Sequence, residues 1–126
     1  MKLLTAVAAI PLLLALGAAA DAACIYPQAP QTFPNGASAT KEEMLAAQAT
    51  VKEYAKAVQE VYLPCLEQEQ NDTIAALDPA DPEFAQKKLS AESIHAKKHN
   101  AALDELQAVA ARWGEEKKAF EAKSAK

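Results

Sequence analysis

Two long stretches of this chain place apolar residues at alternating steps of three and four, the spacing that forms one continuous stripe along an α-helix. In residues 40–77 the stripe consists of Met44, Ala47, Val51, Tyr54, Val58, Val61 and Cys65. In residues 82–120 it consists of Leu89, Ala96, His99, Leu103, Leu106, Ala110, Trp113 and Phe120. No segment alternates apolar and polar residues as a half-buried strand does. The spacing therefore predicts an all-α protein in which the two stripes face each other in a long antiparallel helical hairpin.

Prolines and capping residues mark where these helices begin and end. Thr40 and Glu43 have the spacing of a capping box, so the first helix is predicted to begin directly after Thr40. Pro64 interrupts the first stripe, and a proline inside a helix costs about 3 kcal/mol because it removes a hydrogen bond and clashes with a preceding carbonyl. We therefore expect the first helix to be kinked or broken near Pro64. Asp81 followed by Pro82 predicts the start of the second helix, with Asp81 as its N-cap.

The second helix is expected to be weakest toward its C-terminus. Gly114 lies inside the pattern, where glycine costs up to about 1 kcal/mol relative to alanine. Residues 117–126 are mostly polar and are expected to be loosely held. Together, residues 40–126 make up the predicted helical hairpin domain.

Residues 23–39 cannot form a helix, because they contain three prolines and an Asn35-Gly36 pair. They are predicted to form an extended, Pro-rich N-terminal arm that ends in a turn. Such an arm of about 16 residues reaches about 50 Å, whereas about 25 helical residues span about 37 Å. The arm is therefore long enough to run back along the first helix.

Residues 1–22 have the pattern of a cleavable signal peptide. Lys2 precedes an apolar run at residues 3–16, which is followed by a series of small residues. The run is shorter than the roughly 20 residues that a transmembrane helix needs. Cleavage is expected after Ala20 or Ala22, which predicts a periplasmic or secreted protein with no stable membrane anchor.

The chain beyond the predicted cleavage site has few large apolar residues. From residue 23 onward it holds 22 Val, Ile, Leu, Met, Phe, Tyr and Trp residues beside 23 Ala residues. Alanine favours helix formation but buries little area, so the helices are expected to be robust and the core thin. Apolar residues outside the stripes could be covered by the arm or by a second copy in a four-helix bundle. We expect a monomer rather than a homodimer.

Cys24 and Cys65 are the two cysteines of the chain. An even number of cysteines in an exported protein favours a disulfide. A bond between them would close a loop of roughly 42 residues and stabilise the fold by about 4 kcal/mol in the chain-entropy description. Neither cysteine belongs to a Cys-x-x-Cys motif, so a catalytic thiol is not expected.

Glu92, His95 and His99 are three and four residues apart and share one helix face. Two imidazoles and a carboxylate could bind Zn²⁺ or Cu²⁺. Two features oppose this interpretation: no Glu follows His95 as in H-E-x-x-H, and Lys97 and Lys98 would repel a cation. The alternative is that His99 simply fills a position of the stripe. No metal or cofactor is therefore assigned.

No nucleophile motif, phosphate-binding loop or dinucleotide fingerprint is present, so we expect no enzyme activity. The formal net charge of −4, without a basic stripe, argues against a nucleic-acid partner. The long amphipathic helices favour contact with another, unidentified protein in the envelope or outside the cell. The alternatives are a metal-binding periplasmic protein and a membrane-surface amphipathic protein.

The stretch from Cys24 to Leu66 also resembles small uncharacterised periplasmic or secreted α-helical proteins of Gram-negative bacteria. The elements that carry the resemblance are Cys24, Pro27, Phe33-Pro34-Asn35-Gly36, Ala39-Thr40-x-x-Glu43-Met44, Ala47-Gln48, Val51-Lys52-x-Tyr54 and Tyr62-Leu63-x-Cys65-Leu66. The resemblance covers about 40 residues and implies export, the disulfide and a helical body, but no particular activity. Pro64 departs from the uninterrupted helix expected there.

Overall fold

The computed structural model describes residues 23–126, and most of this part of the chain is helical. Its elements are α1 (Lys41–Lys56), the π-helical turn η1 (Ala57–Tyr62), α2 (Leu63–Ala75) and α3 (Phe84–Ser124). No strand occurs within residues 23–126, and the predicted all-α class is confirmed. The predicted signal peptide, residues 1–22, lies outside the described residues.

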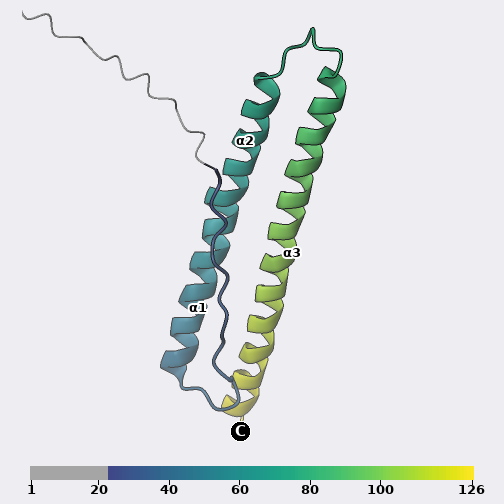
Figure 1. Cartoon of the computed structure of the whole chain (residues 1–126). Helices are drawn as coiled ribbons and strands as arrows, with labels where there is room; N and C mark the ends of the chain where they lie inside the picture. Colours follow the sequence, from purple (N-terminus) through teal and green to yellow (C-terminus); the bar gives the residue numbers. More distant parts are fainter. Residues whose placement is uncertain (1–22) are drawn as a thin grey trace, which may run out of the picture.

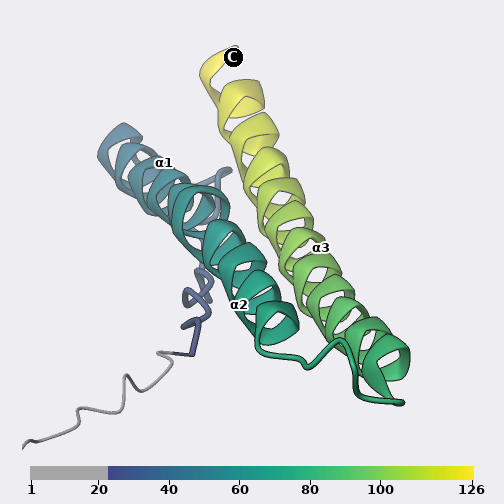
Figure 2. The same ribbon diagram turned by 90° about the horizontal axis from the view of Figure 1, so that it is seen from above.

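The helices form two columns that lie side by side and run antiparallel. α3 lies alongside α1, η1 and α2, and residues 76–83 join the two columns at one end (Figure 1). Figure 2 shows the same two columns side by side from a second direction. Residues 23–39 have no regular secondary structure and run along these helices toward the end where α1 begins and α3 ends (Figure 1).

The capping box predicted at the start of α1 is confirmed. The hydroxyl of Thr40 accepts a hydrogen bond from the Glu43 N–H at 3.2 Å, and the Glu43 carboxylate accepts one from the Thr40 N–H at 2.8 Å. Both bonds satisfy N–H groups that have no partner inside the helix. The helix therefore begins at Lys41, as the sequence predicts.

Pro64 is accommodated by a π-helical turn rather than by a break. The N–H of Leu63 bonds the carbonyl of Val58, which lies five residues back instead of four. The wider turn relieves the clash between a proline ring and the carbonyl before it. Pro64 is the second residue of α2, directly after the π turn. The first helix is thus continuous, and the distortion expected near Pro64 takes the form of a widened turn.

The π turn also shifts the buried stripe by one residue. Val58 is fully buried, as predicted, but the buried residues beyond it are Tyr62 and Leu66. Val61, which was predicted to lie in the stripe, is 66% exposed. The predicted register is therefore wrong beyond Val58, because a π turn holds one more residue than an α-helical turn. The same shift takes Cys65 out of the helix–helix stripe.

In the middle of α3, the buried stripe also lies one residue away from the predicted stripe. Ala102 and Val109 are buried, whereas Leu103 is half-buried and Ala110 is exposed. The buried set satisfies the three-four spacing as well as the predicted one does, so spacing alone could not separate them. Leu89, another predicted stripe residue, is 65% exposed.

The start of α3 differs from the prediction. The helix begins at Phe84, after an N-cap at Glu83 that has no side-chain capping bond. Asp81, the predicted N-cap, instead accepts hydrogen bonds from the Glu83 N–H at 2.8 Å and from Lys87 Nζ at 2.6 Å. The bond from Lys87, followed by that from the Glu83 N–H, lowers the pKa of the Asp81 carboxyl below its ordinary value.

The C-terminal part of α3 is held more firmly than its composition suggests. The helix continues through Gly114 to Ser124. The prediction of a loosely held tail at residues 117–126 is therefore wrong for most of that segment. Phe120 packs against a buried cluster that includes Trp113. Lys123 Nζ donates a hydrogen bond to the carbonyl of Ala39 at 2.6 Å. Contacts with the N-terminal segment therefore hold in place residues that the sequence predicted to be loosely held.

In the part of the chain that the structure describes, the core consists of two clusters along the line between the columns. The first contains the buried residues Ala29, Tyr54, Val58, Tyr62, Leu66, Ala102 and Val109. The second contains Ala39, Met44 and Trp113. Phe33 and Val51 pack against both clusters. Since Ala29, Phe33 and Ala39 come from the N-terminal segment, that segment supplies part of the core of a protein with few large apolar residues.

Candidate functional site

The predicted disulfide is confirmed. Cys24 and Cys65 are bonded, and their Cα atoms are 5.8 Å apart. The bond ties the N-terminal segment to α2 directly after the π turn. Ile25, which follows Cys24, is 88% exposed and does not cover the helices. The neighbouring Tyr26 turns inward instead and packs against the first cluster.

All three tyrosines meet where the N-terminal segment, the first helix and α3 come together. The hydroxyl of Tyr26 donates to the Glu105 carboxylate at 2.7 Å and lies 2.7 Å from the hydroxyl of Tyr54. Because the single hydrogen of Tyr26 goes to Glu105, Tyr54 is the donor in the bond between the hydroxyls. The rings of Tyr26 and Tyr62 pack edge to face with centroids 5.0 Å apart. This tyrosine network links three segments of the fold through neutral hydroxyls.

The pKa values of the network follow from its position. Burial raises the pKa of Tyr26 well above its usual range, and the hydrogen bonds to Tyr54 and Glu105 raise it further. Burial is also the largest cause of the raised pKa of Tyr54. Ionising either hydroxyl would place a negative charge in a half-enclosed site beside Glu105. The network is therefore suited to holding the segments together and not to exchanging protons near neutral pH.

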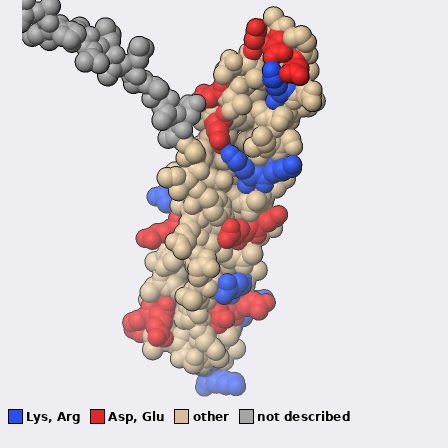
Figure 3. Space-filling model, in the orientation of Figure 1, with Lys and Arg blue, Asp and Glu red and all other residues tan. Residues whose placement is uncertain are grey.

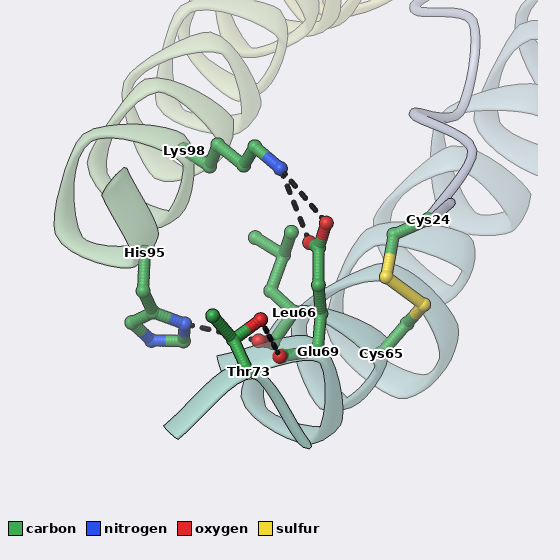
Figure 4. Close-up of polar contacts among 7 residues, drawn as sticks. All are labelled: Cys24, Cys65, Leu66, Glu69, Thr73, His95 and Lys98. Carbon is green, nitrogen blue, oxygen red and sulfur yellow. Dashed lines mark hydrogen bonds and ion pairs between the residues drawn. A yellow bond between two sulfur atoms is a disulfide. The ribbon is translucent and has the colours of Figure 1, made fainter. Parts of the chain in front are cut away.

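His95 and His99 lie at a shallow cavity of about 360 Å³ between α3 and the first helix. The opposite side of the cavity is lined by Gln59, Leu63, Pro64, Glu67 and Gln70. We call this cavity the histidine groove. Nδ1 of His95 lies 3.1 Å from the carbonyl oxygen of Leu66, toward which the ring points in Figure 4. The rings of the two histidines have centroids 5.7 Å apart and planes inclined by 31°.

Glu92, the predicted third member of this face, does not join the two histidines. Its carboxylate pairs with Lys88, one turn earlier on α3, at 3.9 Å. Within residues 23–126, no group of three or more His, Cys, Asp or Glu side chains is placed to hold a metal ion. The structure thus brings together His95 and His99, but not Glu92, and places the two histidines opposite α2.

Lys98, which was expected to repel a cation near the histidines, is paired with a carboxylate of α2. Lys98 reaches across to α2 and pairs with Glu69 at 3.1 Å, as Figure 4 shows. Over the face seen in Figure 3, acidic and basic side chains are interspersed without a continuous stripe of one sign. Among the residues that the structure describes, no helix is long and apolar enough to cross a membrane.

Two features of these sites were not predicted from the sequence. The bond from Tyr26 to Glu105 joins residues 79 positions apart, and no local pattern signals it. The groove wall formed by Pro64 and Glu67 depends on the π turn, for which Pro64 was the available signal.

Comparison with protein-family models, with curated proteins and with solved structures finds no match for this chain. Inference about its function therefore starts from its own residues.

Proposed function

We propose that this protein is a non-enzymatic exported protein that acts by contact with another protein, in the envelope or outside the cell. One observation carries the proposal: within residues 23–126, five large apolar side chains remain more than half exposed, although this part of the chain has few such residues to bury. They are Ile25, Leu45, Val61, Leu89 and Ile94. Exposed apolar side chains that gather in one place are typical of interaction surfaces.

Two of these side chains belong to the segments that the disulfide joins. Ile25 directly follows Cys24 and is 88% exposed, and Val61 precedes Cys65 by one helical turn and is 66% exposed. Residues four apart on a helix share a face, so Val61 lies on the side of the helix where the N-terminal segment is attached. This pair, which we call the crosslink patch, is the proposed centre of contact.

A preorganised body supports a role in recognition. The N-terminal segment is crosslinked to α2 by Cys24–Cys65, and Tyr26 joins it to both helical columns through hydrogen bonds to Tyr54 and Glu105. A surface that is already ordered loses less conformational entropy on binding, so more of the contact energy contributes to affinity. The crosslink patch would therefore bind without rearrangement of the helices.

Export is part of the proposal. Disulfides persist in oxidising compartments, and the pattern of residues 1–22 is that of a signal peptide. Fractionation of cells that produce the full chain, with mass spectrometry of the purified protein, tests this. The expected result is a protein outside the cytoplasm whose N-terminus is Asp21 or Ala23. A cytoplasmic protein that retains Met1 would contradict it.

A photo-crosslinking residue at position 61 tests the contact proposal in the native host. The matched control carries the same residue at Lys52, an exposed polar position of α1. We expect a discrete crosslinked product from position 61 that Ile25→Glu removes, and no such product from position 52. Equal crosslinking from both positions would refute a specific patch. Two further measurements complete the test. A stable dimer in sedimentation would assign the exposed residues to self-association, and pelleting with lipid vesicles would assign them to a membrane surface.

A further inference from the structure

The histidine groove contains an imidazole that is oriented for binding. A backbone carbonyl can only accept a hydrogen bond, so Nδ1 of His95 carries the hydrogen in its contact with the Leu66 carbonyl. In the neutral ring, Nε2 is then left with a free lone pair directed away from that bond. Metal-binding histidines are usually held in this way, with the second ring nitrogen donating to a carbonyl or carboxylate.

His99 supplies a second nitrogen at the appropriate spacing. It follows His95 by one helical turn, and the two rings are inclined by only 31° with their centroids 5.7 Å apart. Nitrogen ligands of Zn²⁺ lie about 2.0–2.1 Å from the metal, so two of them must come within about 4 Å of each other. The His99 ring must turn to bring its nitrogen within this distance of Nε2 of His95. Among residues 23–126, His99 makes no side-chain hydrogen bond that would prevent the turn, whereas His95 is held by the Leu66 carbonyl. We propose that His95 and His99 form a site for one divalent transition-metal ion, which binds Cu²⁺ more tightly than Zn²⁺.

Oxygen ligands are available across the groove and not along α3. Glu67 and Gln70 of α2 line the same cavity as the two imidazoles, whereas Glu92 pairs with Lys88. Glu67 is exposed and can turn toward a bound ion without unburying apolar surface. Within residues 23–126 Glu67 is not placed to ligate together with both histidines, so in the proposed site it turns from α2 toward an ion held by the two imidazoles, and water fills the remaining positions.

The neighbouring lysines do not block the site. Lys98 is paired with Glu69 at 3.1 Å, which offsets its charge. Lys97 is two residues from each histidine, which places it about 200° around the helix from either ring. The preference for Cu²⁺ follows from the general order of stability of divalent ions on nitrogen ligands. This inference does not depend on the proposed contact function, since the groove and the crosslink patch are formed by different residues.

Titration calorimetry of the untagged full chain with Cu²⁺ and with Zn²⁺, with the disulfide intact, tests the site. We expect one ion per chain, tighter binding of Cu²⁺, and a paramagnetic resonance spectrum of the Cu²⁺ complex with two coordinated imidazoles. His99→Gln is the decisive variant because it removes one ligand and, among residues 23–126, no hydrogen bond to α2. It should weaken Cu²⁺ binding at least about tenfold, since loss even of an outer partner of a ligand costs 10–100-fold. Its melting temperature without metal should equal that of the unchanged protein.

Two further variants distinguish the groove from the alternative face of α3. Glu67→Gln should weaken Cu²⁺ binding several-fold, whereas Glu92→Gln should leave it unchanged. Absence of saturable binding below millimolar Cu²⁺, or unchanged binding by His99→Gln, would overturn the site. An effect of Glu92→Gln as large as that of His99→Gln would overturn the assignment to the groove between α2 and α3.

Discussion

The backbone N–H of Gly36 donates a hydrogen bond to Oε2 of Glu116 at 2.7 Å, which joins residues 80 positions apart. A side-chain carbon at Gly36 would overlap the backbone carbonyl of Glu116 and press against the backbone nitrogen of Phe120. The φ angle of Gly36 is not positive, so the requirement for glycine comes from space and not from backbone torsion. The N-terminal segment thus approaches α3 as closely as two backbones allow.

Gly36→Ala is expected to destabilise the fold by about 1–3 kcal/mol, because the added methyl group must push the segment away from α3. Gly114→Ala is the matched control. Among the described residues, no atom beyond the adjacent residues and the nearby backbone of its own helix lies within 4 Å of a side-chain carbon built at Gly114, and the residue lies inside a helix. The control should therefore stabilise the protein by about 0.5–1 kcal/mol. Urea unfolding measures both, and equal midpoints for the two variants would mean that the close approach is absent in solution.

The shift of the buried stripe at the π turn can be tested by comparing Tyr62→Ala with Val61→Ala. Tyr62 is 7% exposed and packs in the first cluster, so its truncation should cost about 3–5 kcal/mol. Val61 is 66% exposed, and its truncation should change the free energy of unfolding by no more than about 0.5 kcal/mol. The opposite order, measured by thermal or urea unfolding, would show that the first helix keeps a regular α-helical register through Pro64.

The disulfide is expected to contribute a large share of the stability of this small fold. Replacing both Cys24 and Cys65 by serine should lower the free energy of unfolding by about 4 kcal/mol, because the unfolded chain regains the freedom of the closed loop. Reduction of the unchanged protein should have the same effect, and the oxidised protein should contain no titratable thiol. If reduced and oxidised proteins unfold at the same urea concentration, the N-terminal segment is held by its other contacts alone.

The tyrosine network predicts a loss of stability at high pH. The folded-state pKa values of Tyr26 and Tyr54 lie above the ordinary value of 10.0, so the fold favours the protonated hydroxyls. Their contribution is complete below pH 10.0 and declines as the pH rises above it, because the unfolded chain then releases protons that the folded chain retains. Unfolding by urea across this range measures the decline, and the ultraviolet absorbance of tyrosinate reports the ionisation directly. Tyr26→Phe should make the decline shallower, and an equally steep one in that variant would exclude the network as its source.

Much of the helical structure can be predicted from local patterns. The three-four spacing, the capping box at Thr40 and Glu43 and the pair of cysteines each report on interactions within a few residues or on the redox compartment. Each prediction succeeds because its physical cause is present in the local sequence or in the cysteine count.

The register of the stripes could not be predicted in the same way. In α3, Ala102 and Val109 satisfy the three-four spacing as well as their neighbours do, and packing against the first helix decided between them. In the first helix, Pro64 signalled a distortion, but a kink, a break and a widened turn were all compatible with it. The widened turn buries Tyr62 and Leu66 and leaves Val61 exposed, a choice made by the packing of the whole helix.

The sequence by itself determined that this chain forms two long helices and carries one crosslinkable pair of cysteines, because helix periodicity, capping and cysteine count are local or compositional properties. Only the tertiary structure decided that Gly36 meets Glu116, that Tyr26 bonds Glu105, and that His95 faces the carbonyl of Leu66 and not the carboxylate of Glu92. These partners are 29 to 80 residues apart along the chain. Their meeting depends on how the helices and the N-terminal segment pack, and packing energy is a property of the assembled fold, which no short segment contains.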